Sequence, residues 1–220
     1  MIEIIPSIFV SDQQTFERQL KSVEGAVNMV QLDIADGVFV PATTWADPDT
    51  VKNFAEIELQ IELHLMVAHP LEEIEKWIDV PQVVKVLAPV ETTDDLHAVI
   101  ELIHGNGWDA GLVINPDTPA EALDPYLDEI EGVMFMGVHP GQQGQSYIPE
   151  TTERIANFVK KDTGIFVELD GAVNMQTLPE IITTGLDAIC PGSAIFGNAQ
   201  GAKFNIEQME ETIHRLTLNH

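Results

Sequence analysis

The sequence predicts a (β/α)8 barrel, also called a TIM barrel, formed by residues 1–220 as a single domain. Eight short β-rich runs alternate with longer amphipathic, acid-rich segments along the whole chain, and no linker or low-complexity block interrupts them. Strands that alternate with helices pair in parallel, and eight such units in about 200–250 residues close into a barrel. A doubly wound open sheet is the alternative, but no GxGxxG motif follows the first run.

The eight expected strands follow one another at regular intervals. They are EIIPSIF (3–9), MVQLDIA (29–35), QIELHLM (60–66), VVKVLA (83–88), DAGLVI (109–114), GVMFMGV (132–138), IFVELD (165–170) and DAICPG (187–192). A helical segment is expected after each strand. The first helix has Ser11 or Asp12 as its cap, and TPAEALDPYLDEIEG (118–132) places Pro119 in the first turn of another.

The N-terminus and the cysteine content favour a cytoplasmic location. The opening MIEIIPSIFV has no basic leader and reads as a first strand, and no apolar run approaches the roughly 20 residues that span a bilayer. Cys190 is the single cysteine, so it cannot form an internal disulfide. Its apolar surroundings favour a small core residue over a nucleophile.

The charge balance excludes two classes of partner. The chain has 36 acidic and 10 basic residues, a formal net charge of -26. Such a surface repels nucleic acid and anionic membranes, so we expect neither as a partner. It also repels a phosphorylated substrate unless the site is locally positive or salt screens the remaining charge. The simpler interpretation of this acidic composition is a strongly hydrated surface. The more specific hypothesis is adaptation to a cytoplasm with high salt.

Polar residues close several of the apolar strands, which marks them as site candidates. In barrels of this class the chemistry lies at the C-terminal ends of the strands. The candidates are Ser7, Gln31 with Asp33, His64 with Met66, Lys85, Asn115, Met136 with His139, Asp170, and Gly192 with Ser193.

Asp33, His64 and Asp170 form the candidate chemical centre. Two carboxylates in one partly dry cavity repel each other, so either one is protonated or a cation neutralises both. A His with two Asp residues suits Zn²⁺, Fe²⁺ or Mn²⁺. Two opposed carboxylates also suit inversion of a carbon next to a carbonyl, where one removes a proton and the other returns one. Taken singly, each Asp could cap a loop and His64 could be a core residue.

Glycine-rich loops after the last three strands indicate a phosphate site. They are HPGQQGQ (139–145), DGAVN (170–174) and PGSAIFGN (191–198), and the last leads into a short helix. Backbone N–H groups at this position of a barrel commonly hold phosphate. No Lys or Arg lies in these loops, so backbone dipoles would hold the phosphate. Ordinary tight turns are the alternative interpretation of each loop.

In motif order and spacing, the chain resembles the D-ribulose-5-phosphate 3-epimerase family over nearly its whole length. The matching motifs are PSIF, QLDIADGVFVP, ELHLMV, GLVINPDTP, MGVHPGQQGQ, ELDGAVN and GSAIFGN. The resemblance implies a barrel of the ribulose-phosphate binding type. It also implies interconversion of ribulose 5-phosphate and xylulose 5-phosphate with a divalent metal, usually Zn²⁺ or Fe²⁺.

The same resemblance implies roles for individual residues. Asp33 and Asp170 would be the acid/base residues and also metal ligands, with His64 as a further ligand. Ser7 would contact substrate, and Met66 and Met136 would line the pocket. The phosphate would meet Gly144, Gly171, Gly192 and Ser193, with the methyl group of Ala172 close by. His139 would either touch substrate or order its own loop.

Several residues depart from the family pattern. Gln31 stands where the family has a metal-binding His, and an amide oxygen is a weaker ligand than imidazole for a borderline metal. The site would therefore bind metal loosely, prefer a harder ion such as Mn²⁺ or Mg²⁺, or work without one. Further departures are Ala35, Val38, Ala42, Gln142, Gln143, Ala172 and the lack of a His-x-Glu near VVKVLAPVE.

These departures leave three alternative functions open. More room beside Ala35 would favour an epimerase of another ketose phosphate, such as a ketohexose phosphate. Lys85 could be the Schiff-base nucleophile of an aldolase, or could extend to the rim of the barrel. A barrel that binds a sugar phosphate without turnover is the non-enzymatic alternative. Pairing into a homo-oligomer through outer helices is common for such barrels, but no surface in this sequence is singled out for it.

Overall fold

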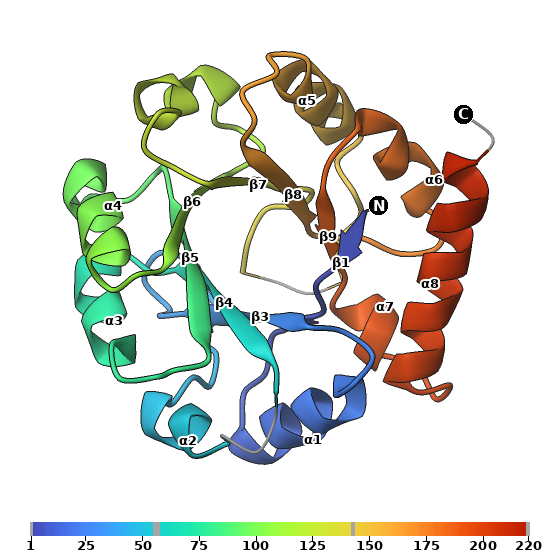
Figure 1. Ribbon diagram of the computed structural model, residues 1–220, viewed down its shortest axis with the longest axis horizontal. Helices are drawn as coiled ribbons and strands as arrows, with labels where there is room; N and C mark the ends of the chain where they lie inside the picture. The colour runs from blue at the N-terminus through green and yellow to red at the C-terminus, as the bar shows by residue number, and fades with distance from the viewer. Residues whose placement is uncertain (1, 55–57, 142–143, 219–220) are drawn as a thin grey trace.

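A closed barrel of parallel strands forms the centre of the molecule, with helices around it (Figure 1). The structure is a computed structural model that describes residues 2–54, 58–141 and 144–218. The sheet order is β1-β9-β8-β7-β6-β5-β4-β3-β2, with all pairs parallel. Because β1 and β2 are consecutive pieces of one N-terminal segment, this order closes the sheet into a (β/α)8 barrel.

The later strands lie where the alternation predicted them. The bounds are β1 Glu3–Ile4, β2 Ser7–Ile8, β3 Met29–Ala35, β4 Gln60–Met66, β5 Val83–Pro89, β6 Asp109–Ile114, β7 Gly132–Met136, β8 Phe166–Asp170 and β9 Ala188–Cys190.

The first strand differs from the prediction because it is divided in two. Pro6 has no N–H group and interrupts the ladder of hydrogen bonds. Closure is kept across the break: the N–H of Ile5 donates to the carbonyl of Ile189 (2.9 Å), and the N–H of Gln31 donates to the carbonyl of Pro6 (3.0 Å). The segment therefore pairs with β9 first and with β3 next.

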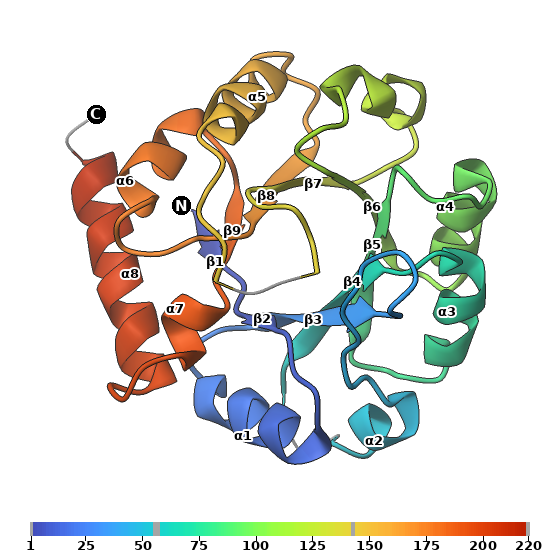
Figure 2. The ribbon, with the colours of Figure 1, turned by 180° about the vertical axis from the view of Figure 1, so that it is seen from behind.

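Helices surround the barrel in both views (Figures 1 and 2). The first α-helix begins after Asp12, whose carboxylate accepts a hydrogen bond from the N–H of Thr15 (2.8 Å), so Asp12 rather than Ser11 is the cap. The bounds are α1 Gln13–Val23, α2 Pro48–Asn53, α3 Pro70–Trp77, α4 Leu96–Gly105, α5 Glu150–Val159, α6 Leu178–Ile181, α7 Ser193–Phe196 and α8 Ala202–Thr217. A short 3-10 helix, η2, spans Ile182–Thr184.

The segment after β6 is the main correction to the predicted helices. Residues 118–132 were expected to form an α-helix with Pro119 in its first turn. Instead a 3-10 helix, η1, spans Ala120–Tyr126, and Pro119 lies just before it. Pro125 lies inside this segment and cannot donate a backbone hydrogen bond, which prevents a regular α-helix from forming there.

The core has two parts. Between the sheet and the helices lies a large apolar layer that includes Phe16, Trp77 and Phe135, all fully buried. Inside the barrel, a smaller apolar cluster contains Ile5 and residues of β5, β6, β7 and β9. Buried polar and charged residues of β2, β3, β4, β5 and β8 also lie in the interior, and these form the site described below.

In the described part of the chain, no helix is both long and apolar enough to cross a membrane.

The acidic surface predicts a salt-dependent stability. We expect the thermal unfolding midpoint to rise by several degrees between dilute buffer and about 1 M KCl, because salt shortens the Debye length to about 3 Å and screens repulsion among the exposed members of the 36 acidic residues. Thermal scans monitored by circular dichroism would measure this shift. Sucrose at matched osmolality is the control, and an equal rise in sucrose would contradict an electrostatic cause.

Candidate functional site

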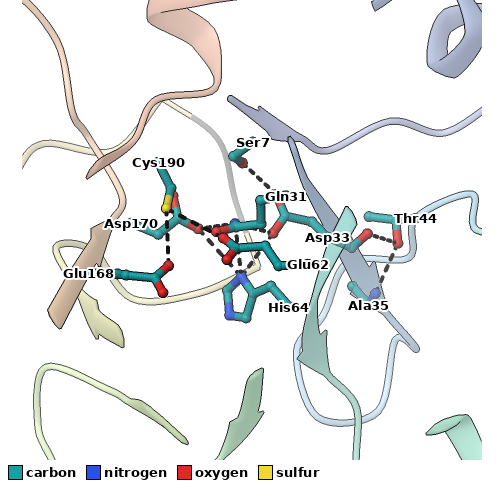
Figure 3. Close-up of polar contacts among 10 residues, drawn as sticks. All are labelled: Ser7, Gln31, Asp33, Ala35, Thr44, Glu62, His64, Glu168, Asp170 and Cys190. Carbon is teal, nitrogen blue, oxygen red and sulfur yellow. Dashed lines mark hydrogen bonds and ion pairs between the residues drawn. The ribbon is translucent and has the colours of Figure 1, made fainter. Parts of the chain in front are cut away.

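Three titratable side chains meet inside the barrel at the C-terminal ends of β3, β4 and β8 (Figure 3). His64 Nδ1 lies 2.8 Å from Asp33 Oδ1 and 3.4 Å from Asp170 Oδ2. Asp33 and His64 are direct partners in the register of β3 and β4, which places them at the same level of the barrel. Asp33, His64 and Asp170 are 2%, 1% and 9% exposed, so all three groups are shielded from bulk water.

Gln31 joins these three residues from the same strand as Asp33. Side chains two residues apart on a strand share a face, so Gln31 also points into the barrel. Its Nε2 donates hydrogen bonds to Asp33 Oδ1 (2.7 Å) and Asp170 Oδ2 (2.9 Å), and lies 3.3 Å from His64 Nδ1. Its Oε1 is buried and has no hydrogen-bond partner among the described residues.

Burial and close contacts shift the proton affinities in this cluster. Burial raises the pKa of Asp33, the charge of Asp170 adds to this, and the hydrogen bond with His64 opposes it. For His64, burial lowers the pKa, but the hydrogen bonds to Asp170 and Asp33 outweigh it and raise the pKa to about 10. The imidazolium form of His64 therefore compensates the two carboxylates when no other cation does so.

The cluster fits a divalent metal ion. One ligand atom each from Asp33, His64 and Asp170 lies within 4.8 Å of the others, and a His with two carboxylates is a donor set typical of divalent metals. The orphaned Oε1 of Gln31 is a third oxygen, and a fourth candidate ligand, next to this set. The described residues can therefore supply three or four ligands.

Two hydroxyl groups fix the position of Asp33. Ser7 Oγ on β2 donates to Asp33 Oδ2 (2.7 Å), as Figure 3 shows. Thr44 Oγ1 donates to the carbonyl of Asp33 (2.8 Å) and accepts from the N–H of Ala35 (2.9 Å). The carboxylate and the backbone of Asp33 are thus held by separate partners.

Asp36 orders the loop that follows β3. Its carboxylate accepts hydrogen bonds from the N–H groups of Val38, Phe39 and Ala68, each at 2.8 Å. Although partial burial raises the pKa of Asp36, these three bonds outweigh it and lower the pKa below its ordinary value. Asp36 therefore orders the loop, whereas the carboxylate of Asp33 faces the site.

An Asp36→Ala variant should lose about 1 kcal/mol of unfolding free energy. The three backbone N–H groups that donate to the Asp36 carboxylate would then bond only to water, at a largely exposed position. Since the folded-state pKa is lowered, this contribution is present above the unfolded pKa and is lost as the pH falls through the folded pKa. Urea unfolding at neutral pH and at about pH 3 would measure the difference between wild type and variant. An undiminished difference at the lower pH would contradict this assignment.

A cavity of about 280 Å³ opens next to the cluster. Both Asp33 and Asp170 line it. So do eight of the nine residues expected to bind substrate: Ser7, Met66, Met136, Gly144, Gly171, Ala172, Gly192 and Ser193. The cavity also includes Phe9, Gln145, Asn174 and Cys190, which were not predicted to bind substrate. Gln145 and Asn174 are the last residues of two of the glycine-rich motifs, and this position could have identified them as residues near the substrate.

His139 is the ninth residue and lies elsewhere. Its side chain is exposed, with Nδ1 3.6 Å from Asp117 Oδ2, and it is not among the residues that line the cavity. This position suits the loop-ordering alternative for His139. Gln142 and Gln143, two of the departures from the family motif, lie outside the described residues.

Close backbone packing explains two of the glycines in the cavity wall. A Cβ atom at Gly171 would lie 2.8 Å from a methyl group of Val138, and Gly171 has a φ of +103°. A Cβ atom at Gly192 would lie 3.2 Å from the carbonyl oxygen of Ser7. Ala172 has a φ of +56°, so its methyl group stands at a position that favours glycine and costs about 1–2 kcal/mol.

A second buried polar layer, which the sequence analysis missed, lies beside the cluster. It consists of Glu62, Glu168, Lys85 and Cys190. Lys85 Nζ lies 3.4 Å from Glu62 Oε2 and forms an ion pair with Glu168 Oε1. Cys190 Sγ is 3.8 Å from both Glu62 Oε1 and Glu168 Oε2. Glu62 and Glu168 precede His64 and Asp170 by two residues, so strand periodicity was the available signal.

This placement bears on two sequence hypotheses. Lys85 does not line the cavity, and its amine is enclosed by carboxylates and by the ring of Phe166 at 4.9 Å, which does not support a Schiff-base nucleophile or an extension to the rim. Burial raises the pKa of the Cys190 thiol well above its ordinary value, which suits a small core residue rather than a nucleophile.

Comparison with known proteins identifies the family. The model described as "Ribulose-phosphate 3 epimerase family" matches residues 3–196. The chain belongs to the ribulose-phosphate 3-epimerase family. The ribulose-phosphate 3-epimerase of Bacillus subtilis is 32% identical over 217 residues, covering 92% of this chain and 96% of that protein. The enzyme of that name from Escherichia coli K12 is 31% identical over 226 residues, with 97% of each chain covered. This family member is therefore a sugar-phosphate epimerase, an enzyme of the isomerase class.

Solved structures with low sequence identity confirm the fold. KGPDC from Streptococcus mutans has a TM-score of 0.75 at 12% identity, and the alignment covers 98% of this chain and 99% of that one. Orotidine 5'-monophosphate decarboxylase from Sulfolobus solfataricus has a TM-score of 0.71 at 11% identity, covering 99% and 100%. At these identities the likeness establishes the barrel fold of this epimerase-family chain.

Proposed function

We propose that this enzyme interconverts D-ribulose 5-phosphate and D-xylulose 5-phosphate, with Asp33 and Asp170 as the two acid/base residues. The observation that carries the proposal is the convergence of both carboxylates on one cavity whose remaining wall contains the glycine-rich loops. The carboxylates would transfer protons at the reacting carbon, and the loops would bind the phosphate.

The reaction requires proton transfer on both faces of C3. The C3 proton is acidic because C3 is next to the C2 carbonyl, and its removal gives an enediolate. One of the two Asp residues removes that proton as a carboxylate, and the other returns a proton to the opposite face. At each step one residue must be protonated and the other ionised. The raised pKa of Asp33 supports such a division, because a buried carboxyl group holds its proton at higher pH.

Asp33, His64 and Asp170 would hold a divalent ion, with Gln31 as a fourth, weaker ligand. When bound, such an ion stabilises the negative charge that develops on the substrate oxygens. The three-oxygen, one-nitrogen set favours Mn²⁺ or Mg²⁺ more than a histidine-rich set would, with Zn²⁺ and Fe²⁺ as the other candidates.

The phosphate subsite would depend on neutral donors. None of the described residues that line the cavity is Lys or Arg. Backbone N–H groups of the loops at Gly144, Gly171 and Gly192, with the hydroxyl of Ser193, would hold the phosphate. Such a site gains little from long-range attraction, because the protein surface is strongly negative.

Packing around Ala35 favours a five-carbon substrate over a larger ketose phosphate. Ala35 clusters with Val40 and Met66, and the partly buried Phe39 packs against this group. Ala35 is not among the residues that line the cavity. Its small side chain therefore leaves no additional room for substrate.

Deuterium exchange at C3 tests the proposal. Ribulose 5-phosphate in D₂O would be followed by NMR with the protein as purified, after chelation, and after adding Zn²⁺, Fe²⁺, Mn²⁺ or Mg²⁺. We expect deuterium at C3 together with xylulose 5-phosphate. A parallel assay with a ketohexose phosphate tests the alternative substrate. Absence of exchange with the pentulose phosphate under every condition would overturn the proposal.

A further inference from the structure

The side-chain oxygen of Gln31 is an unsatisfied polar atom in the interior of the barrel. Gln31 is 0% exposed, and its Oε1 has no hydrogen-bond partner among the described residues. A buried amide oxygen without a partner costs on the order of 1–3 kcal/mol. An arrangement in which this oxygen meets a cation would give it a partner.

The nitrogen of the same amide occupies the centre of the ligand cluster. Nε2 is 2.7 Å from Asp33 Oδ1, 2.9 Å from Asp170 Oδ2 and 3.3 Å from His64 Nδ1. These atoms belong to the three residues that could hold a metal ion. The amide therefore presents its positive end at the point where a cation would meet the same atoms, as Figure 3 shows.

Turning the amide by 180° about its terminal bond exchanges the nitrogen and oxygen without moving the backbone. With the oxygen inward, two carboxylate oxygens and an amide oxygen would face one another, which is unfavourable unless a cation lies between them. With a cation present, the inward nitrogen would be the unfavourable arrangement. The orientation of Gln31 and the occupancy of the cluster are therefore coupled.

We propose that Gln31 is an amide switch in the metal centre, an inference that relies on the divalent ion of the proposed function. Without an ion, Nε2 bridges Asp33 and Asp170 and replaces part of the missing positive charge. When an ion binds, the amide turns and Oε1 becomes a ligand. The ion must displace two hydrogen bonds to carboxylates, so affinity is moderate. An oxygen ligand favours the harder ions Mn²⁺ and Mg²⁺ over Zn²⁺.

NMR of glutamine side-chain amides would observe the switch directly. The protein would be labelled with ¹⁵N at its glutamine side chains, and the Gln31 signal would be assigned by its loss in a Gln31→Leu variant. In protein treated with a chelator, the Gln31 amide protons should be protected from exchange with solvent. Adding Mg²⁺ or Zn²⁺ should shift both of its proton signals and reduce that protection. The amide of Gln19 on α1, whose Oε1 also lacks a partner among the described residues, is the internal control and should not respond. An unmoved Gln31 signal in metal-loaded protein would overturn the proposal.

Metal titration of variants separates a ligand from a competing donor. Isothermal titration with Mn²⁺ would compare wild type, Gln31→Leu and a Gln82→Leu control remote from the cluster. Loss of the oxygen ligand should weaken Mn²⁺ binding on the order of tenfold or more in Gln31→Leu and leave the control unchanged. Unchanged or tighter Mn²⁺ binding in Gln31→Leu would show that Gln31 only competes with the ion, and would overturn the proposal. Absence of both Mn²⁺ and Zn²⁺ binding to wild type would overturn it as well. Substrate exchange at C3, measured on the same samples, reports separately on the proposed epimerisation.

Discussion

An Asp170→Asn variant should lose epimerisation by about 10²–10⁴-fold, because an amide cannot transfer the proton on its face of C3. The remaining carboxylate, Asp33, can still remove and return a proton on the other face. Exchange of the C3 proton without inversion should therefore survive for one of the two epimers and be lost for the other. NMR in D₂O, starting separately from ribulose 5-phosphate and xylulose 5-phosphate, would measure the rate of C3 exchange and the rate of epimerisation for each substrate.

The Asp33→Asn variant is the matched control. It should show the mirror image, with exchange surviving only for the opposite epimer. Loss of a metal ligand alone would lower exchange of both epimers together, and metal analysis of both variants would identify that effect. If each variant exchanges both epimers equally, or retains epimerisation, the two-base assignment is wrong.

A Lys85→Met variant should lose about 3–5 kcal/mol of unfolding free energy. Lys85 lies between Glu62 and Glu168, which are both 0% exposed, and it forms ion pairs with both. Its removal would leave two carboxylates buried together without compensation. Burial already raises the pKa of Glu62 even with the lysine present. Urea unfolding of chelated protein at neutral pH would measure the loss.

Removing the carboxylates with the lysine provides the control. A Lys85→Met, Glu62→Gln, Glu168→Gln variant contains no buried charge in this layer and should recover most of the lost stability. A single Lys85→Met change that costs less than about 1 kcal/mol would contradict the assignment. No recovery in the triple variant would show that the lysine stem, rather than its charge, is what the layer requires.

The sequence determined the barrel and most of its chemical centre. Alternating β-rich and helical segments predicted the fold, and the family comparison and the structure confirm it. Asp33, His64 and Asp170 could be grouped from their places in the sequence, because the C-terminal ends of parallel strands meet at one end of a barrel. Their convergence therefore follows from strand periodicity and chain order.

Other features depended on contacts between segments distant in the sequence. Pro6 divides the first strand, while the adjacent strands β9 and β3 keep their hydrogen bonds to this segment. Lys85 became an internal counterion because its inward face met carboxylates from two other strands. His139 turned to Asp117 at the surface. The role of Gln31 was the least accessible to sequence: an amide is a donor at one end and an acceptor at the other, and only the atoms around it decide which end faces the site.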